Sequence, residues 1–124
     1  MAASLHYNPD KRFLTIIVSG SLSFEEFDGI GRTIMASTEY PSDVNTLWDL
    51  RQTDFSGINS QTLRQYLFHR EKYSYRGNTK IAFVTADDVS FGLMRMYEML
   101  SVDLPQQIMV FKNYQEAEDW LVET

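Results

Sequence analysis

The sequence predicts an α/β fold with a mostly parallel sheet, and three observations lead to this prediction. Apolar, β-branched segments alternate with amphipathic helical segments from residue 13 onward, which is typical of parallel strands joined by crossover helices. Residues 8–11 (Asn-Pro-Asp-Lys) are turn residues between two short strand segments and predict one antiparallel hairpin. Residues 23–26 and 113–116 have the capping-box spacing of helix starts.

The first half of the chain predicts a hairpin followed by one helix. The first strand begins around Leu5 and Tyr7, and the second covers residues 13–18 and ends at Gly20. Ser23 is the predicted N-cap of a helix that continues to about residue 38, with Leu22 placed for a hydrophobic staple. Pro41 then ends this helix, because the residue before a proline avoids the α region.

The second half predicts three further strand–helix units. Strands are expected at residues 46–50, 80–85 and 107–111, and a loop at residues 51–59. The helices are expected to begin near Ser60, after Asp87 or Asp88, and after Asn113, and Gly77 is the expected C-cap of the first of these. The predicted order is therefore β-β-α-β-α-β-α-β-α, in a single domain over residues 1–124 with a five-stranded sheet.

Composition narrows the classes of function. The 124 residues are 44% hydrophobic and 14% aromatic, contain no cysteine, and carry a net charge of −6. These values favour a packed domain in a reducing compartment, and we expect a cytoplasmic location. The start of the sequence lacks a signal-peptide pattern, and no apolar segment has the length of a membrane span. The acidic balance disfavours nucleic-acid binding, because phosphate backbones are repelled and no basic patch is evident.

Several segments together resemble the STAS fold, the SpoIIAA-like family of bacterial anti-sigma-factor antagonists, and in particular small stand-alone STAS-like proteins. The resemblance covers essentially the whole chain. The segments that carry it are residues 47–51, 54–57, 82–85 with Asp87 and Asp88, 91–97, and Phe111 with Ala117, Trp120 and Leu121. The resemblance implies a regulatory, protein-binding module.

Ser60 corresponds to the serine that is phosphorylated by a partner kinase in the antagonists. The family motif is Asp-Ser-Ser-Gly, whereas residues 59–62 here are Asn-Ser-Gln-Thr, so the acid and the following Ser-Gly are replaced. Ser60 is therefore a candidate phosphosite by resemblance, with a plain helix N-cap as the alternative.

Polar residues follow the predicted parallel strands at their carboxyl ends, where ligands bind in open α/β sheets. We expect any small-ligand site to use this rim, whose candidate residues are Asp49, Arg51, Asp54, Ser56, Asn59, Thr85 and Asp87. Asp49 lies in an otherwise apolar strand and must therefore find a partner or a ligand. An ion pair with Arg51 is the structural alternative.

Catalysis, metal binding and cofactor binding have no motif in the sequence. The two histidines, His6 and His69, are far apart and stand in no recognisable motif, and no HExxH, GxSxG or phosphate-loop pattern occurs. We therefore expect no enzyme activity, no metal and no cofactor. A small enzyme that uses Asp49 and its neighbours remains a second alternative.

The helix after Asp87 is apolar on two sides. Its expected core stripe consists of Val89, Leu93, Met96, Tyr97 and Leu100. A second side is expected to carry Phe91, Met94, Arg95, Glu98 and Met99. Phe91 could pack under a neighbouring element, or this side could be an interface.

We therefore expect a non-catalytic interaction module that binds a protein partner or forms a homodimer through this helix. The first alternative is a carrier or sensor of a small apolar or anionic ligand, which would need an apolar cavity of about 300 Å³ behind Phe91 and Met94.

Overall fold

The computed structural model describes residues 2–21, 23–41, 43–70 and 79–123. Its strands are β1 (Ala2–Asn8), β2 (Phe13–Ser21), β3 (Asn45–Asp54), β4 (Lys80–Val84) and β5 (Gln107–Phe111). Its helices are α1 (Phe24–Ala36), α2 (Ser60–Arg70), α3 (Asp88–Leu100) and α4 (Tyr114–Val122). The predicted element order is confirmed. Leu22 and Gly77, predicted as a staple residue and a helix end, lie outside the described residues.

The five strands form one sheet in the order β1-β2-β3-β4-β5. β1 pairs with β2 in antiparallel register, and the other neighbouring pairs are parallel. The hairpin turn forms because the Asn8 side-chain oxygen accepts hydrogen bonds from the backbone N–H groups of Asp10 and Lys11. The predicted sheet, parallel except for its first strand, is confirmed.

β3 is longer than the sequence predicts, and two candidate residues therefore lie in a strand and not in a loop. Residues 51–54 were expected in a loop, but they belong to β3, and residues 52–54 pair with the end of β2, with Ser21 opposite Asp54. A register irregularity between Ile17 and Ser19 accommodates the polar segment. Gly20 lies inside β2, at a φ of 79°, and does not end it. Arg51 and Asp54 are therefore strand residues.

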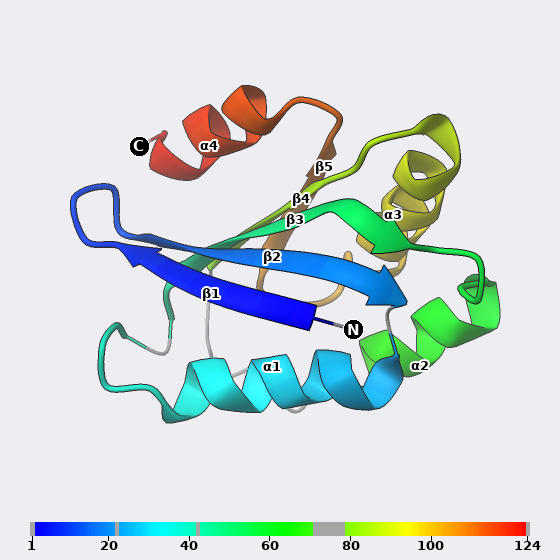
Figure 1. Cartoon of the computed structure of the whole chain (residues 1–124), viewed down its shortest axis with the longest axis horizontal. Helices are drawn as coiled ribbons and strands as arrows, with labels where there is room; N and C mark the ends of the chain where they lie inside the picture. Colours follow the sequence, from blue (N-terminus) through cyan, green and yellow to red (C-terminus); the bar gives the residue numbers. More distant parts are fainter. Residues whose placement is uncertain (1, 22, 42, 71–78, 124) are drawn as a thin grey trace.

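The two faces of the sheet have different covers. α1, α2 and α3 contribute to a large core on one face, which includes Ile34, Leu63, Tyr97 and the sheet residue Phe83. On the other face α4 packs through Ala117 and Leu121 onto a smaller cluster from β2, β3 and β4. Figure 1 shows this arrangement, with α4 on one side of the sheet and α1 and α2 on the other.

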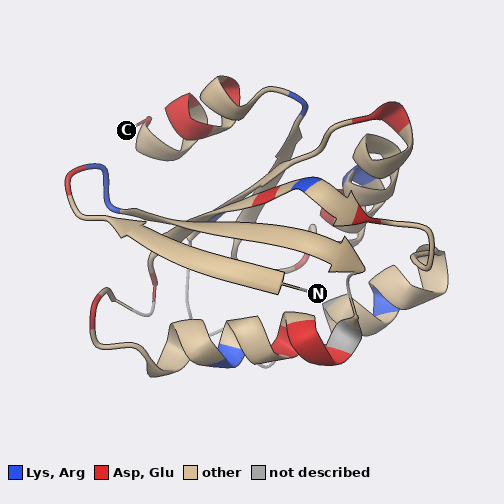
Figure 2. Ribbon diagram, viewed as in Figure 1, with Lys and Arg blue, Asp and Glu red and all other residues tan. Residues whose placement is uncertain are grey.

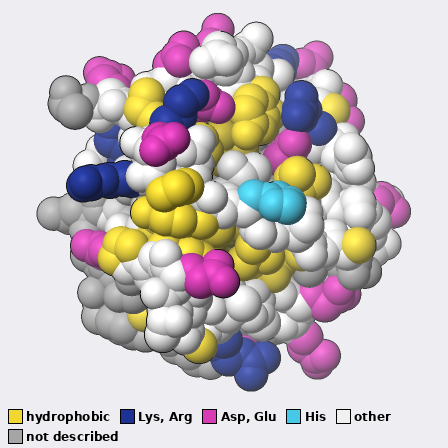
Figure 3. All heavy atoms as spheres, turned by 60° about the vertical axis from the view of Figure 1, so that its left-hand side comes forward, with side chains coloured by type: hydrophobic (Ala, Val, Ile, Leu, Met, Phe, Trp, Pro, Cys, Tyr) yellow, Lys and Arg dark blue, Asp and Glu magenta, His cyan; other side chains and the backbone are white. Residues whose placement is uncertain are grey.

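α4 contacts β3, β4 and β5. It also reaches the hairpin, because Phe13 of β2 belongs to the cluster beneath it and Lys11 in the hairpin turn pairs with Glu118. Figure 3 shows the side of the molecule that carries the hairpin turn, with hydrophobic side chains near its centre and charged side chains mostly around them. Lys80 fixes the end of α4, because its ammonium group donates to the carbonyl oxygens of Trp120 and Glu123. None of the helices in the described part of the chain is long and apolar enough to cross a membrane.

Candidate functional site

The first group of rim residues lies on the α4 side of the sheet. Leu50 contributes to the large core on the opposite face, and strand side chains alternate, so its neighbours Asp49 and Arg51 face α4. The Arg51 guanidinium donates to both carboxylate oxygens of Asp49, at 2.9 and 2.8 Å. The guanidinium carbon also lies 5.2 Å from the centre of the Tyr114 ring.

This pair explains how a carboxylate can be buried in β3. The Asp49 side chain is only 10% exposed, and the side-chain hydrogen bond from Arg51 lowers the Asp49 pKa below its ordinary value. Burial acts in the opposite direction but is the smaller effect. The structural alternative for Asp49, an ion pair with Arg51, is what the structure contains.

The second group lies in the connection between β3 and α2. The Asp54 carboxylate accepts a hydrogen bond from the Ser56 backbone N–H, and this bond lowers the Asp54 pKa. The Asn59 side-chain oxygen accepts from the backbone N–H of Thr62, three residues later. Asn59 is therefore the N-cap of α2, and the prediction that Ser60 caps this helix is wrong. Ser60 is the first residue of α2, and it is exposed.

The third group lies at the carboxyl ends of β4 and β5. Asp87 is the N-cap of α3: its carboxylate accepts from the Ser90 backbone N–H at 2.8 Å, which lowers its pKa. Thr85 is fully buried, and its backbone N–H donates to the Phe111 carbonyl. Asp88 pairs with Lys112, whose ammonium group lies over the Phe91 ring.

The rim therefore does not converge into one site. The Asp49–Arg51 pair faces α4, whereas Asp54, Asn59 and Asp87 are engaged in turns and helix caps at other points of the rim. Among the described residues, no three His, Asp or Glu side chains are grouped as metal ligands would be. The rim residues serve local structure, which leaves little acid–base chemistry to assign to them.

α3 meets the sheet through a different side from the one predicted. Its buried residues are Ser90, Met94 and Tyr97, and Ser101 directly after it is also buried. Val89, expected in the core, is 73% exposed, and Met96 is 38% exposed. The predicted stripe is therefore correct for Tyr97, which is buried, and for Leu93, which packs against the core, but wrong for Val89 and Met96, because the buried side is rotated by roughly a quarter of a helical turn.

Buried serines explain the error. The Ser101 hydroxyl donates to the Tyr97 carbonyl at 2.6 Å, and the Ser90 hydroxyl donates to the Asp87 side chain at 2.9 Å. Because these hydroxyls are satisfied locally, small polar residues can face the core although a hydrophobicity pattern counts them as solvent-facing. Met94 lies between them along the helix and is only 4% exposed, so the expectation that it contributes to an outer surface is wrong.

The other interface candidates, Phe91, Arg95, Glu98 and Met99, differ in the contacts that they make. Phe91 is partly buried against the large core, as its structural alternative expected. Arg95 pairs with Glu98, and the second oxygen of Glu98 accepts from the backbone N–H of Val110 in β5. Met99 is 67% exposed, so it remains available as a contact residue.

Sequence reasoning missed several exposed apolar residues in this region, namely Val89, Met96, Val102 and Met109. One sequence pattern could have identified two of these residues, Val89 and Met96, as members of the outward side of α3. Residues 89, 92, 96 and 99 (Val, Gly, Met, Met) have the spacing i, i+3, i+7, i+10, which places them on one side of a helix.

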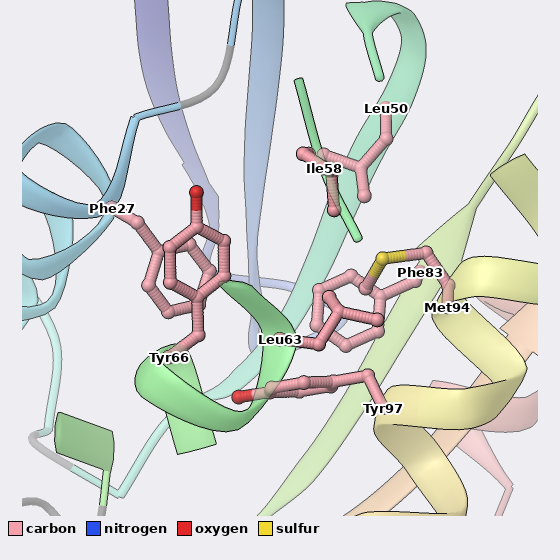
Figure 4. A pocket seen from close by; sticks show the side chains of 8 residues that line it. All are labelled: Phe27, Leu50, Ile58, Leu63, Tyr66, Phe83, Met94 and Tyr97. Atoms are coloured by element: carbon pink, nitrogen blue, oxygen red, sulfur yellow. The ribbon is translucent and has the colours of Figure 1, made fainter. Parts of the chain in front are cut away.

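An apolar cavity lies between the sheet and the three helices that cover it. Figure 4 shows its lining side chains, which come from α1, α2, α3, the sheet and the connection between β3 and α2: Phe27, Leu50, Ile58, Leu63, Tyr66, Phe83, Met94 and Tyr97. Its volume is about 10 Å³, close to that of one water-sized probe. This is far below the roughly 300 Å³ that a small-molecule carrier needs, so this cavity does not favour the carrier alternative.

Comparison with known proteins supports the fold. The chain is similar to the crystal structure of an uncharacterised protein of the DUF3478 family, with a SpoIIAA-like fold, from Shewanella loihica PV-4. The TM-score is 0.63 and the sequence identity 18%, over 97% of this chain and 92% of the other. The fold is therefore STAS-like, as the resemblance implied. No protein-family model and no curated protein matches the sequence.

Proposed function

We propose that this chain is a non-catalytic STAS-like interaction module that self-associates through the outward side of α3. The observation that carries the proposal is the location of the exposed apolar side chains. Seven large hydrophobic residues are exposed in the described part of the chain, and four of them lie on α3 or the turn after it: Val89, Met96, Met99 and Val102. Clustered apolar exposure of this kind is typical of interaction surfaces.

The spacing on α3 suits a second copy of the same helix. Val89, Gly92, Met96 and Met99 occupy positions that repeat by three and four residues, which is the pattern of a helix–helix seam. A Cβ atom at Gly92 would meet nothing within 4 Å, so this position leaves room for a partner helix to approach closely. Methionine side chains adapt to an opposing surface, which also suits a seam.

The rim supports a non-catalytic role. Asp49, Asp54 and Asp87 each accept hydrogen bonds from neighbours in the chain, and their lowered pKa values keep them ionised at neutral pH. An ionised carboxylate with a lowered pKa is a weak general base and cannot donate a proton. We also propose that the protein acts in the cytoplasm, which a cysteine-free sequence fits. Fractionation of cells that express the tagged chain would test this location.

Native mass spectrometry at micromolar concentrations tests self-association, with Met96→Glu and Val122→Glu as matched variants. Met96 is 38% exposed on α3, and Val122 is 41% exposed on α4. We expect the wild type and Val122→Glu to be dimeric. Met96→Glu should weaken the dimer at least about tenfold, because a charge would be desolvated in the seam.

A wild-type chain that is monomeric under these conditions contradicts the proposal. Equal dissociation by both variants would also contradict it, since the effect would then reflect added negative charge and not the position of the residue.

A further inference from the structure

The outer edge of β5 has backbone groups that are free to pair with another strand. Among the strands that the structure describes, β5 lies at the end of the sheet and pairs only with β4. The Gln107 N–H donates to Thr79, and the Phe111 carbonyl accepts from Thr85, so odd-numbered residues of β5 are bonded toward β4. In a parallel pair the groups alternate, so the N–H and C=O of Ile108 and Val110 point away from the sheet.

Glu98 forms a hydrogen bond with one of these outward groups, the N–H of Val110. Its carboxylate accepts from the Val110 N–H at 3.2 Å, while its other oxygen accepts from Arg95 at 2.7 Å. The carboxylate oxygen thus stands where the carbonyl oxygen of an added strand would lie. Among the described residues, no group forms a hydrogen bond with the N–H of Ile108 or with the carbonyls of Ile108 and Val110.

A hollow adjoins this edge at the start of β5. It has a volume of about 640 Å³, is open to solvent, and lies between the end of α3, the turn after it and β5. Ile108 is part of its wall, and Met99, Val102, Leu104 and Pro105 supply further apolar surface. A segment hydrogen-bonded to Ile108 would therefore have the hollow within reach of its side chains.

We propose that the free edge of β5 binds an extended peptide segment of another protein as an additional strand, with an apolar side chain of that segment in the adjoining hollow. Outward-facing N–H and C=O groups two residues apart match the repeat of an extended backbone. This site differs from the outward side of α3 proposed for self-association, although Met99 and Val102 belong to both.

The shape of the site selects a peptide over a second copy of this chain. A twofold pairing of two β5 edges is antiparallel, so the hollow at the start of one β5 would face the end of the other, where Lys112 is paired with Asp88 and supplies no apolar side chain. A peptide side chain is convex and can enter. The net charge of −6 favours basic residues in the segment, since opposite charge raises the encounter rate. Figure 2 shows that acidic residues lie on many parts of the fold, including α4 and the start of α3.

The test uses an acetylated, amidated heptapeptide of alternating lysine and leucine, titrated into the ¹⁵N-labelled full chain and followed by NMR. We expect saturable shifts centred on the amides of Ile108 and Val110. Two control peptides carry N-methyl groups, one on its lysines and one on its leucines. In an added strand, either the lysine N–H groups or the leucine N–H groups point toward β5, but not both. The control peptide that is methylated on the set facing β5 should lose roughly tenfold in affinity, and the other should bind within about twofold of the parent.

Paired charge-removing variants give a second readout. Glu98→Ala exposes the Val110 N–H and should raise the peptide affinity about threefold or more, since one further backbone hydrogen bond becomes available. Glu116→Ala removes an equal charge from α4 and should lower it slightly. Absence of binding, equal effects of the two methylated peptides, shifts centred away from β5, or reduced affinity of Glu98→Ala would each overturn the proposal.

Discussion

The carboxyl-end rim and the outward side of α3 differ in whether their side chains already have partners. On the rim, Asp49 is bonded to Arg51, and Asp87 caps α3. On the outward side of α3, Val89 and Met99 are 73% and 67% exposed. The rim would have been the default site in an open α/β sheet. The difference teaches that polar residues at that location can all serve local structure, while apolar surface elsewhere remains exposed.

The largest effect is expected from the two methionines that lie two residues apart on opposite sides of α3. Met94→Glu would place a carboxylate in the core without a partner, and we expect a loss of at least about 3 kcal/mol in the free energy of unfolding. Met96→Glu should change it by less than about 0.5 kcal/mol in the monomer, because that side chain reaches water. Urea denaturation followed by circular dichroism measures both.

Similar losses in the two variants would contradict the assignment of an inner and an outer side to α3. Met94→Leu is a suitable control for packing, because it keeps the volume of the side chain and should cost less than about 1.5 kcal/mol.

A smaller effect is expected at Asp49, where it would show whether the rim pair is structural. Asp49→Asn removes the charged hydrogen bonds to Arg51 and should cost about 1 kcal/mol at pH 7, since Arg51 is half exposed and can be solvated instead. The Asp49 pKa is lowered in the folded state. Its contribution is therefore fully present above the unfolded pKa and is lost as the pH falls through the folded value.

The stability difference between the wild type and Asp49→Asn should accordingly shrink as the pH decreases below about 4. Urea unfolding midpoints at pH 7 and at several acidic pH values measure it. A difference that stays constant over this range would show that the ionised carboxylate does not stabilise the fold.

The smallest effect distinguishes the two candidate caps of α2. Asn59→Ala removes the side-chain oxygen that accepts from the Thr62 N–H and should cost about 1 kcal/mol. Ser60→Ala should change stability by less than about 0.5 kcal/mol, because Ser60 is an exposed residue inside the first turn. Thermal unfolding of both variants decides between them, and the reverse order would restore Ser60 as the cap.

Part of this fold could be predicted because its signals are local. The turn at Asn8 and the N-caps Ser23, Asp87 and Asn113 each depend on hydrogen bonds within three or four residues, so a short segment of sequence contains the whole interaction. The full length of β3 could not be predicted in this way. Its last residues are polar and are strand only because β2 pairs with them, and that partner is more than twenty residues away in the chain.

The candidate sites could not be assigned from a hydrophobicity pattern, although the hydrogen bonds that decide them join residues close together in the chain. Asp49 and Arg51 were expected at the end of a strand but lie inside β3, and hydrogen-bonding distances decided that the rim residues are engaged separately. The rotation of α3 followed from buried Ser90 and Ser101, whose hydroxyls are satisfied within the helix. Periodicity could not reveal this, because it scores each residue by polarity and not by whether its polar group is already bonded.

The sequence by itself determined the α/β class, the order of strands and helices, and most helix starts, because alternation and capping are encoded within a few residues. Only the tertiary structure decided which side of α3 is buried, which residue caps α2, and which edge of β5 stays open. The buried side of α3 and the open edge of β5 result from packing between segments far apart in the chain, and a local pattern contains only one partner of each such contact. For the cap of α2 the sequence offers two adjacent polar residues, and the bond from the Thr62 N–H to Asn59 decides between them.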